Sequence, residues 1–166
     1  MKKLLILGLI LSTGLFQSCT VNESPQPINN EFLAEVFEVN ADFTPANSFR
    51  NYYNLNPVIF DSDVLLVYEF VGLDKKGADI WKPLPQIYTS DNGIHQYNFD
   101  FTKVDFSIFL DANFDRMRLN NSWRLGKTFR VVIVPGKFAN IVDKNNLQNV
   151  MNTLHLTESS VVDLSK

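Results

Sequence analysis

Residues 95–101 read His-Gln-Tyr-Asn-Phe-Asp-Phe, and this stretch decides the fold class. Apolar or aromatic side chains alternate with polar ones, which predicts a β-strand with one buried and one solvated face. Just before it, Asp91-Asn92-Gly93 is a turn signal, because Asn and Gly tolerate the positive φ angles of a tight turn. Residues 87–90 lead into that turn. A β-hairpin is therefore predicted for this part of the chain.

The same pattern of short runs extends in both directions along the chain. Each run is bounded by Asn, Asp, Gly or Pro, which are typical turn residues. The run 63–72 is almost wholly apolar on both faces, so we expect a central strand that is covered on each side. In the run 104–110 we expect every second side chain, from Val104 to Leu110, to face inward. The strands expected outside the hairpin are residues 35–43, 48–55, 63–72, 104–110 and 129–134.

The hydrophobic period changes near the C-terminus. Between Leu147 and Leu154 the apolar residues are three or four positions apart, which predicts an α-helix. Asn145, three residues before Gln148, is typical of the start of a helix. Several short strands followed by one helix predict a mainly β fold. We expect an antiparallel β-sandwich or open barrel with one C-terminal α-helix against an end or edge.

Length and composition are those of one globular domain. The chain has 166 residues, of which 45% are hydrophobic, and this is enough apolar material to fill a core. We expect a single β-rich domain with the C-terminal helix over residues 31–166. The formal net charge is −3, and the basic residues do not form a cluster. Nucleic-acid binding needs clustered Lys and Arg side chains, so a nucleic-acid partner is not expected.

The N-terminus has the pattern of an export signal. The apolar run 4–16 follows two lysines; it has the length of a secretory signal and is too short to span a membrane by itself. Residues 15–19 read Leu-Phe-Gln-Ser-Cys, which resembles a bacterial lipobox. That resemblance implies cleavage before Cys19 and lipidation of its sulfur. We expect a signal peptide over residues 1–18, and a lipidated cysteine with a flexible tether over residues 19–30.

The sequence shows no recognisable catalytic constellation. Its two histidines are His95, on the apolar face of a strand, and His155, which follows the apolar positions of the terminal helix; each position has a structural explanation. No Gly-x-Ser-x-Gly motif, phosphate-binding glycine loop or His-Glu-x-x-His motif occurs. We therefore predict a protein that is not an enzyme and that uses no cofactor.

Carboxylates offer the enzymatic and metal-binding alternatives. Asp100 with Asp105, or Asp111 with Asp115, could serve as the paired groups of a hydrolase. Asp111, Asn113 and Asp115 also copy the opening of a calcium loop, with oxygen ligands at alternate positions. The sequence then lacks the glycine and the bidentate carboxylate that such a loop requires. Solvated turn residues are the simpler interpretation, so these three are weak candidates for metal ligands.

Five aromatic residues lie outside the clean alternation. Trp81, Tyr88 and Trp123 are the main ones, and Tyr52 and Tyr53 are the others. Such rings can form a platform that stacks on sugar rings or on a protein partner, provided that the two tryptophans are exposed and coplanar. The alternative is that they close the ends of the core. Trp81, Tyr88 and Trp123 are therefore candidate binding residues for a glycan or a protein ligand.

Four stretches span most of the predicted domain: FDSDVLLVY at 60–68, WKPLPQ at 81–86, YNFDF at 97–101 and FRVVIVP at 129–135. Together they resemble an uncharacterised family of lipoproteins from flavobacteria and other Bacteroidota. Some members of that family carry a collagen-like, Gly-Pro-rich segment between the lipidated cysteine and the β domain, whereas this chain has only the short tether. The resemblance implies the fold class and an envelope location, and it carries over no site residue except Cys19.

These observations predict a lipoprotein that is anchored in the bacterial cell envelope, at the outer membrane or on the periplasmic face. Its expected partner is the membrane itself, through acyl chains such as palmitate on Cys19. We expect the β domain to be a non-enzymatic binding or structural domain. A carbohydrate- or protein-binding surface module and a hydrolase with paired carboxylates are the alternatives.

Overall fold

The predicted hairpin is present in the computed structural model, which describes residues 34–165. It consists of β5 (Gln86–Ser90) and β6 (Gly93–Phe101), and Ser90 pairs directly with Gly93, so the turn contains two residues. The positive φ angle falls on Gly93, at 130°, and not on Asn92. The glycine is needed there for a second reason: a Cβ atom would lie 2.4 Å from Oδ1 of Asn113.

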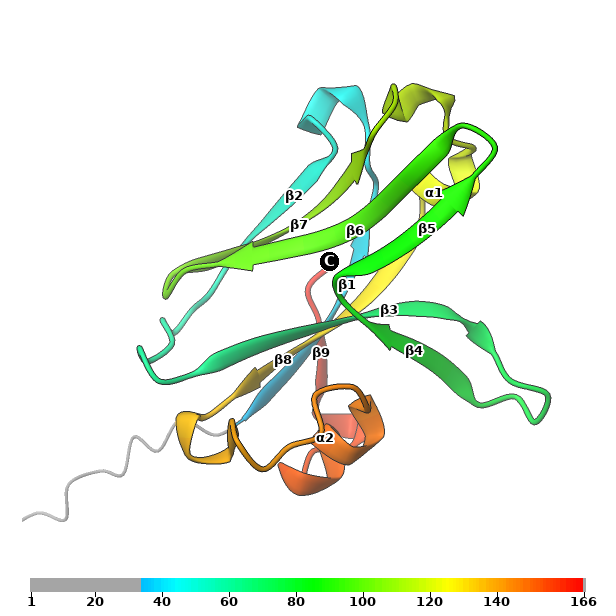
Figure 1. The fold of residues 1–166 in the computed structure, drawn as a ribbon. Helices are drawn as coiled ribbons and strands as arrows, with labels where there is room; N and C mark the ends of the chain where they lie inside the picture. The colour runs from blue at the N-terminus through cyan, green and yellow to red at the C-terminus, as the bar shows by residue number, and fades with distance from the viewer. Residues whose placement is uncertain (1–33, 166) are drawn as a thin grey trace, which may run out of the picture. The chain divides into compact units, whose positions relative to one another are not determined.

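Two antiparallel strands extend this hairpin into a four-stranded sheet. β7 (Asp105–Ala112) pairs with β6, and β2 (Arg50–Asn54) pairs with β7, which gives the order β2-β7-β6-β5. We call this the upper sheet, because it lies uppermost in Figure 1. Val104 was expected to face inward from this sheet. That expectation is wrong, since Val104 precedes β7 and is 53% exposed.

The lower sheet has five strands in the order β4-β3-β8-β1-β9. Its strands are β1 (Glu35–Ala41), β3 (Val64–Leu73), β4 (Asp79–Pro83), β8 (Lys127–Val134) and β9 (Val161–Asp163). All pairs are antiparallel except β1 with β9, which run parallel. Figure 1 shows the two sheets as separate layers, with α2 below the lower one. The fold is therefore mainly β and sandwich-like, as predicted, and it is not a closed barrel.

Two strands of the lower sheet were not predicted. β4 is an edge strand of five residues, in which no side chain is fully buried, so it lacks the clean alternation of a half-buried strand. β9 has only three residues and pairs with the edge of β1. Both strands form because a neighbouring strand offers free backbone N–H and C=O groups as hydrogen-bond partners. The hydrophobic pattern of a short segment gives no information about such pairing.

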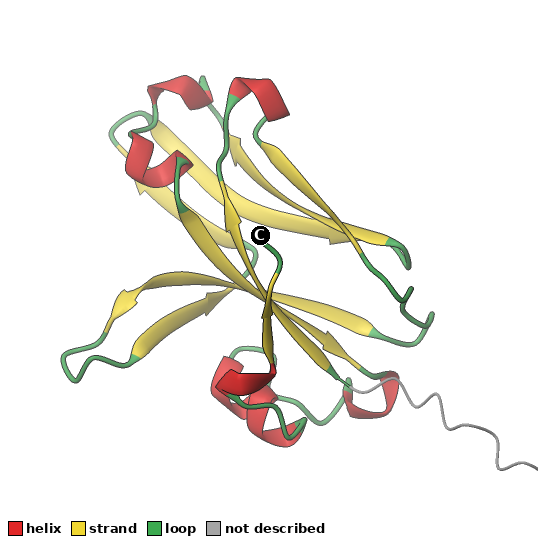
Figure 2. Ribbon diagram, turned by 180° about the vertical axis from the view of Figure 1, so that it is seen from behind, coloured by secondary structure: helices red, strands yellow, loops and turns green. Residues whose placement is uncertain are grey.

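Figure 2 shows the helical segments in two groups, one at the top and one at the bottom of the view. α2 (Leu147–Thr153) confirms the predicted C-terminal helix, but its N-cap is Asn146, whose side chain accepts a hydrogen bond from the Asn149 backbone. Asn145 therefore does not cap the helix. The other helical segments are α1 (Asn121–Arg124) and the short 3₁₀ helices Pro45–Asn47, Arg116–Arg118, Gly136–Phe138 and Glu158–Ser160. Among the described residues, no helix is long and apolar enough to cross a membrane.

Two hydrophobic clusters hold the domain together. The larger one fills the space between the sheets, where Phe43, Tyr97 and Phe129 pack ring against ring. The smaller one lies between the outer face of the lower sheet and α2, and it includes Tyr68 and Val150. Strand β3 contributes to both clusters, which confirms that it is covered on both faces. The helix packs on a sheet face, and not on an end or edge as expected.

Candidate functional site

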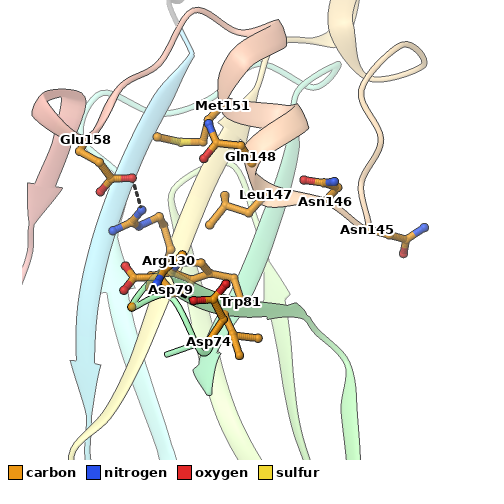
Figure 3. Close-up of a pocket in the computed structure, with 13 residues that line it drawn as sticks. Asp74, Asp79, Trp81, Arg130, Asn145, Asn146, Leu147, Gln148, Met151 and Glu158 are labelled. Carbon is orange, nitrogen blue, oxygen red and sulfur yellow. Dashed lines mark hydrogen bonds and ion pairs between the residues drawn. The ribbon is translucent and has the colours of Figure 1, made fainter. Parts of the chain in front are cut away.

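A cleft lies on the outer face of the lower sheet, and we call it the Arg130–Trp81 cleft. It has a volume of about 620 Å³. Its walls are the β3–β4 loop, the start of α2 and the 3₁₀ helix Glu158–Ser160, and its floor is formed by Arg130 of β8 and Trp81 of β4. Figure 3 shows the side chains of this cleft.

Arg130 is held rigidly at the floor of this cleft. Its side chain is almost fully buried, and its Nη1 and Nη2 atoms each lie 2.8 Å from a carboxylate oxygen, of Glu158 and Glu38 respectively. The guanidinium carbon lies 4.4 Å from the centroid of the Trp81 ring, which is the geometry of a cation–π contact. The Nε atom is buried and has no hydrogen-bond partner among residues 34–165. One donor in the floor is therefore unused.

Trp81 is held in place by its cross-strand neighbour and by Arg130. It stands opposite Phe70 in the β3–β4 ladder, and the centroids of the two rings are 5.3 Å apart. The ladder shifts register between Phe70 and Gly72, and Gly72 has a φ angle of 131°, which a side-chain-bearing residue rarely adopts. A bulge of this kind bends a hairpin locally. Trp81 remains half-buried, so part of the indole ring is in contact with solvent.

The rim of the cleft carries polar groups, two of which are free. The side chains of Asp79 and Asn145 make no hydrogen bond to another described residue. Asp74 is engaged, because its Oδ1 accepts hydrogen bonds from the backbone of Lys76 and Ala78, and these bonds hold its pKa below the usual value. The lining contains three carboxylates and one guanidinium group, so the cleft is acidic.

A smaller cleft of about 340 Å³ lies at the other face of β4, and we call it the Lys82–Trp123 cleft. Its floor is Glu69, which is only 1% exposed. One carboxylate oxygen of Glu69 lies 2.9 Å from Nζ of Lys127, and the other accepts a 2.7 Å hydrogen bond from the hydroxyl of Tyr88. Burial raises the pKa of the Tyr88 hydroxyl, and the bond to the Glu69 carboxylate and its charge raise it further.

An aromatic wall closes one side of the Lys82–Trp123 cleft. The ring centroids of Tyr88 and Trp123 are 4.8 Å apart. His95 lies against both rings, 5.6 Å from Tyr88 and 4.6 Å from Trp123, and it is fully buried. Neither ring nitrogen of His95 has a hydrogen-bond partner within the described part of the chain. Burial lowers the pKa of His95, and the nearby charge of Lys127 lowers it further.

The three candidate binding residues are divided between the two clefts. Tyr88 and Trp123 lie together, whereas Trp81 is on the outer face of the lower sheet. The three rings therefore do not form one surface. Of the other two aromatics, Tyr52 is exposed, and Tyr53 stacks on Phe106 at 4.9 Å, where burial raises its pKa to about 12.

The carboxylates considered for a hydrolase are engaged in structural contacts. Asp100 accepts hydrogen bonds from Ser107 and Arg50, and these bonds lower its pKa, whereas a general acid needs a raised one. Asp105 accepts a hydrogen bond from the hydroxyl of Thr102. Both carboxylates therefore have a hydrogen-bond partner in the fold.

The calcium-like residues also have structural partners. Asp111 lies 3.7 Å from Arg116, and Oδ1 of Asn113 accepts a hydrogen bond from the Ile94 backbone. Asp115 caps the 3₁₀ helix Arg116–Arg118 through the Met117 backbone. No group of three His, Cys, Asp or Glu side chains that could hold a metal ion occurs within residues 34–165. Cys19, the predicted signal peptide and the tether lie outside the described residues.

Sequence reasoning missed the charged residues at the centre of each cleft. Glu69 interrupts the apolar strand β3, and Arg130 interrupts the apolar strand β8. A charged residue inside an otherwise apolar run is the signal that could have found them, because such a group is buried only when it is paired.

No protein-family model, curated protein or solved structure matches this chain. The chemistry of the two clefts is therefore the basis on which a function can be inferred.

Proposed function

We propose that this chain is a non-enzymatic lipoprotein of the bacterial cell envelope, and that its β domain binds a neutral saccharide in the Arg130–Trp81 cleft. The observation that carries the proposal is the combination of groups in that cleft. A half-buried indole ring, a fixed guanidinium group and free amide and carboxylate side chains face one space of about 620 Å³.

Saccharides have the two kinds of surface that this cleft complements. The C–H face of a pyranose ring is apolar and packs on an indole ring, as other amphipathic contacts do. The hydroxyl groups need planar donors and acceptors, which Asp79 and Asn145 supply. The volume lies in the range of ordinary ligand sites.

The charge of the cleft selects among saccharides. Its carboxylates outnumber its single guanidinium group, and the Arg130 charge is already matched by Glu38 and Glu158. A uronic acid or another anionic sugar would meet net repulsion there. We therefore expect neutral sugars to bind and acidic sugars to be rejected.

The envelope location rests on the sequence pattern at residues 1–30 and on the resemblance to Bacteroidota lipoproteins. Lipidation is tested by the intact mass of the protein from a detergent-extracted membrane fraction. We expect the mass of the chain from Cys19 plus acyl groups, and a Cys19→Ala variant that is neither acylated nor membrane-bound. An unacylated, soluble wild-type protein would contradict this part of the proposal.

Saccharide binding is tested by fluorescence of the full-length Trp123→Phe variant, in which Trp81 is the only tryptophan. Maltotriose, cellotriose, xylotriose and chitotriose are titrated separately, with trigalacturonate as the acidic comparison. We expect at least one neutral trisaccharide to give a saturable change with a Kd of about 1 mM or tighter. Failure of all four neutral sugars, or equal binding of the acidic one, would overturn the proposal.

Two further variants locate the binding. Asp79→Ala and Asn145→Ala remove side chains that make no hydrogen bond to another described residue, so both variants should fold normally. Each variant should raise the Kd of the sugar by about fivefold or more. Asp91→Ala, in the distant β5–β6 turn, is the matched control and should leave the Kd unchanged. If the control weakens binding as much as Asp79→Ala does, the site is elsewhere.

A further inference from the structure

Four exposed apolar side chains lie at one end of the sandwich, and we call them the end patch. Val58 and Phe60 belong to the segment between β2 and β3, and Phe101 and Val104 lie at the β6–β7 turn. Each of the four exposes between 41% and 53% of its surface. Apolar side chains that are exposed as a group, and not singly, are typical of an interaction surface.

Backbone hydrogen bonds hold the two segments of the end patch side by side. The N–H of Leu55 donates to the carbonyl of Val104 at 2.8 Å, and the N–H of Ile59 donates to the carbonyl of Lys103 at 3.0 Å. Leu55 and Ile59 are buried in the core between the sheets. The β2–β3 segment therefore has its own anchors in the core, and its exposed side chains are held outward by a fixed backbone.

The end patch has no excess of positive charge. Lys103 is the only Lys or Arg in residues 55–63 and 101–105, and its Nζ lies 2.8 Å from a carboxylate oxygen of Asp61. Asp105 accepts a hydrogen bond from the hydroxyl of Thr102. These two segments thus offer no unpaired cation to an anionic partner. The chemistry of the end patch matches an apolar phase.

The described chain begins at the same end of the molecule as the end patch. β3 starts at Val64, directly after the β2–β3 segment, and Val64 pairs with Val134 of β8. The preceding residue of β8, Ile133, pairs with Glu35, the first residue of β1. The starts of β1 and β3 therefore share one end of the lower sheet, and Figure 1 shows the β6–β7 turn on that side of the molecule.

We propose that the end patch docks on the lipid bilayer in which Cys19 anchors the chain. This inference rests on the lipidation of Cys19 that is part of the proposed function. Ala34 lies fifteen positions after Cys19, so the anchor keeps the start of β1 within about 54 Å of the bilayer. Four half-exposed side chains bind a bilayer weakly by themselves, but a tethered surface meets its own membrane at a high effective concentration.

The test measures how far brominated phosphatidylcholine quenches tryptophan fluorescence in vesicles that carry the anchored full-length protein. Intact mass first shows whether Cys19 is acylated. Acylated protein is reconstituted directly, and unacylated protein is coupled through Cys19, its only cysteine, to a maleimide-bearing phospholipid. Docking is therefore tested in either case, and a failure of lipidation is distinguished from a failure of docking.

Two reporters compare the two ends of the molecule. Phe60→Trp places an indole ring in the end patch, and Asp91→Trp places one in the β5–β6 turn, at the opposite end of β6. We expect brominated lipid to quench at least about half of the emission that Phe60→Trp adds, because a docked side chain enters the boundary between headgroups and acyl chains. The emission that Asp91→Trp adds should be unchanged. Equal quenching of both reporters, or no quenching of Phe60→Trp, would overturn the proposal.

Two further pairs of substitutions in the Phe60→Trp protein separate docking from a general loss of surface hydrophobicity. Val58→Ser with Val104→Ser removes apolar surface from the end patch and should lower the quenching by about threefold or more. Leu73→Ser with Ile87→Ser is the matched control, because both residues are exposed apolar residues of other strands, and it should leave the quenching unchanged. Equal loss in both pairs would contradict docking through the end patch.

The lipid composition tests the role of charge. Phosphatidylglycerol added to the vesicles should leave the quenching of Phe60→Trp unchanged, because the end patch offers no unpaired cation to an anionic headgroup. Quenching that occurs only in the presence of phosphatidylglycerol would show that charge attraction holds this end on the membrane, and it would contradict an apolar docking surface.

Discussion

Glu69 is a charged residue in the interior of a β-sandwich, and its two oxygen atoms explain how the fold accommodates it. One is paired with Lys127 and the other accepts the Tyr88 hydroxyl hydrogen bond. Burying a charge costs free energy, and a close partner with an additional hydrogen bond offsets most of that cost. The contact joins β3 and β8 of the lower sheet to β5 of the upper sheet, so it fixes how the sheets meet at that edge.

Removing the Glu69 charge should therefore destabilise the fold strongly. We expect Glu69→Gln to lower the free energy of unfolding by about 3 kcal/mol, because Lys127 keeps its charge in a mostly buried position without a partner. Urea denaturation measures this loss. The exposed pair Asp61–Lys103 is the comparison, and Asp61→Asn should cost less than about 0.5 kcal/mol. A similar small loss in both variants would show that Glu69 is not part of a buried pair in solution.

The buried His95 should make stability depend on pH. Its pKa is lowered in the folded protein, so the unfolded chain takes up a proton first as the pH falls below the ordinary histidine pKa of about 6.5. The His95 contribution to stability is complete above that pH and is lost as the pH falls toward the folded-state pKa. The slope for this one proton cannot exceed about 1.4 kcal/mol per pH unit.

Urea midpoints between about pH 5 and pH 8 test this expectation. The wild-type protein should become less stable toward the acidic end, and His95→Phe should remove most of that slope. His155→Gln is the control, because His155 is exposed, and it should keep the wild-type slope. A slope that survives in His95→Phe would mean that another group causes it.

At the scale of elements, the backbone geometry at the C-terminus of α2 explains the position of His155. The backbone N–H of Leu156 bonds to the carbonyl of Met151, and that of His155 bonds to the carbonyl of Asn152, which is the Schellman pattern of a helix C-terminus. His155 has a φ angle of 56°, the left-handed conformation that favours glycine. Its position therefore has a backbone reason and needs no catalytic one.

A glycine at this position should stabilise the protein. We expect His155→Gly to raise the free energy of unfolding by about 0.5–1 kcal/mol, because glycine adopts the left-handed conformation without steric cost. His155→Ala keeps the steric cost and should give no such gain. Thermal unfolding of the two variants distinguishes the cases, and an equal midpoint for both would contradict the helix-end assignment.

The elements that the sequence predicted correctly are those with a strong local pattern. The alternation in β6 and β7 and the helical spacing in α2 report which side chains face the core, and burial of those side chains determines the element. β4 and β9 depend on backbone pairing with a neighbour that is distant in sequence. The local hydrophobic period carries no information about such a pairing. It also does not distinguish Asn145 from Asn146 as the N-cap of α2.

At the scale of the whole molecule, the two strands β4 and β8 contribute side chains to both clefts. β4 points Trp81 outward and Lys82 inward, and β8 points Arg130 outward and Lys127 inward. The period of two along a strand assigns adjacent residues to opposite faces of a sheet. The sequence predicted the aromatic residues as binding candidates, but their division between two clefts follows from the strand order β4-β3-β8, which only the folded chain shows.

The measurement that tests the central claim most directly is the NMR signal of the two indole N–H groups in the full-length protein. The trisaccharide that binds most tightly in the fluorescence titration is added to the wild-type chain, and the Trp81→Phe and Trp123→Phe variants assign the two signals. We predict that the Trp81 signal shifts to saturation with the same Kd while the Trp123 signal stays in place. A shift of Trp123 alone, or of neither signal, would contradict saccharide binding in the Arg130–Trp81 cleft.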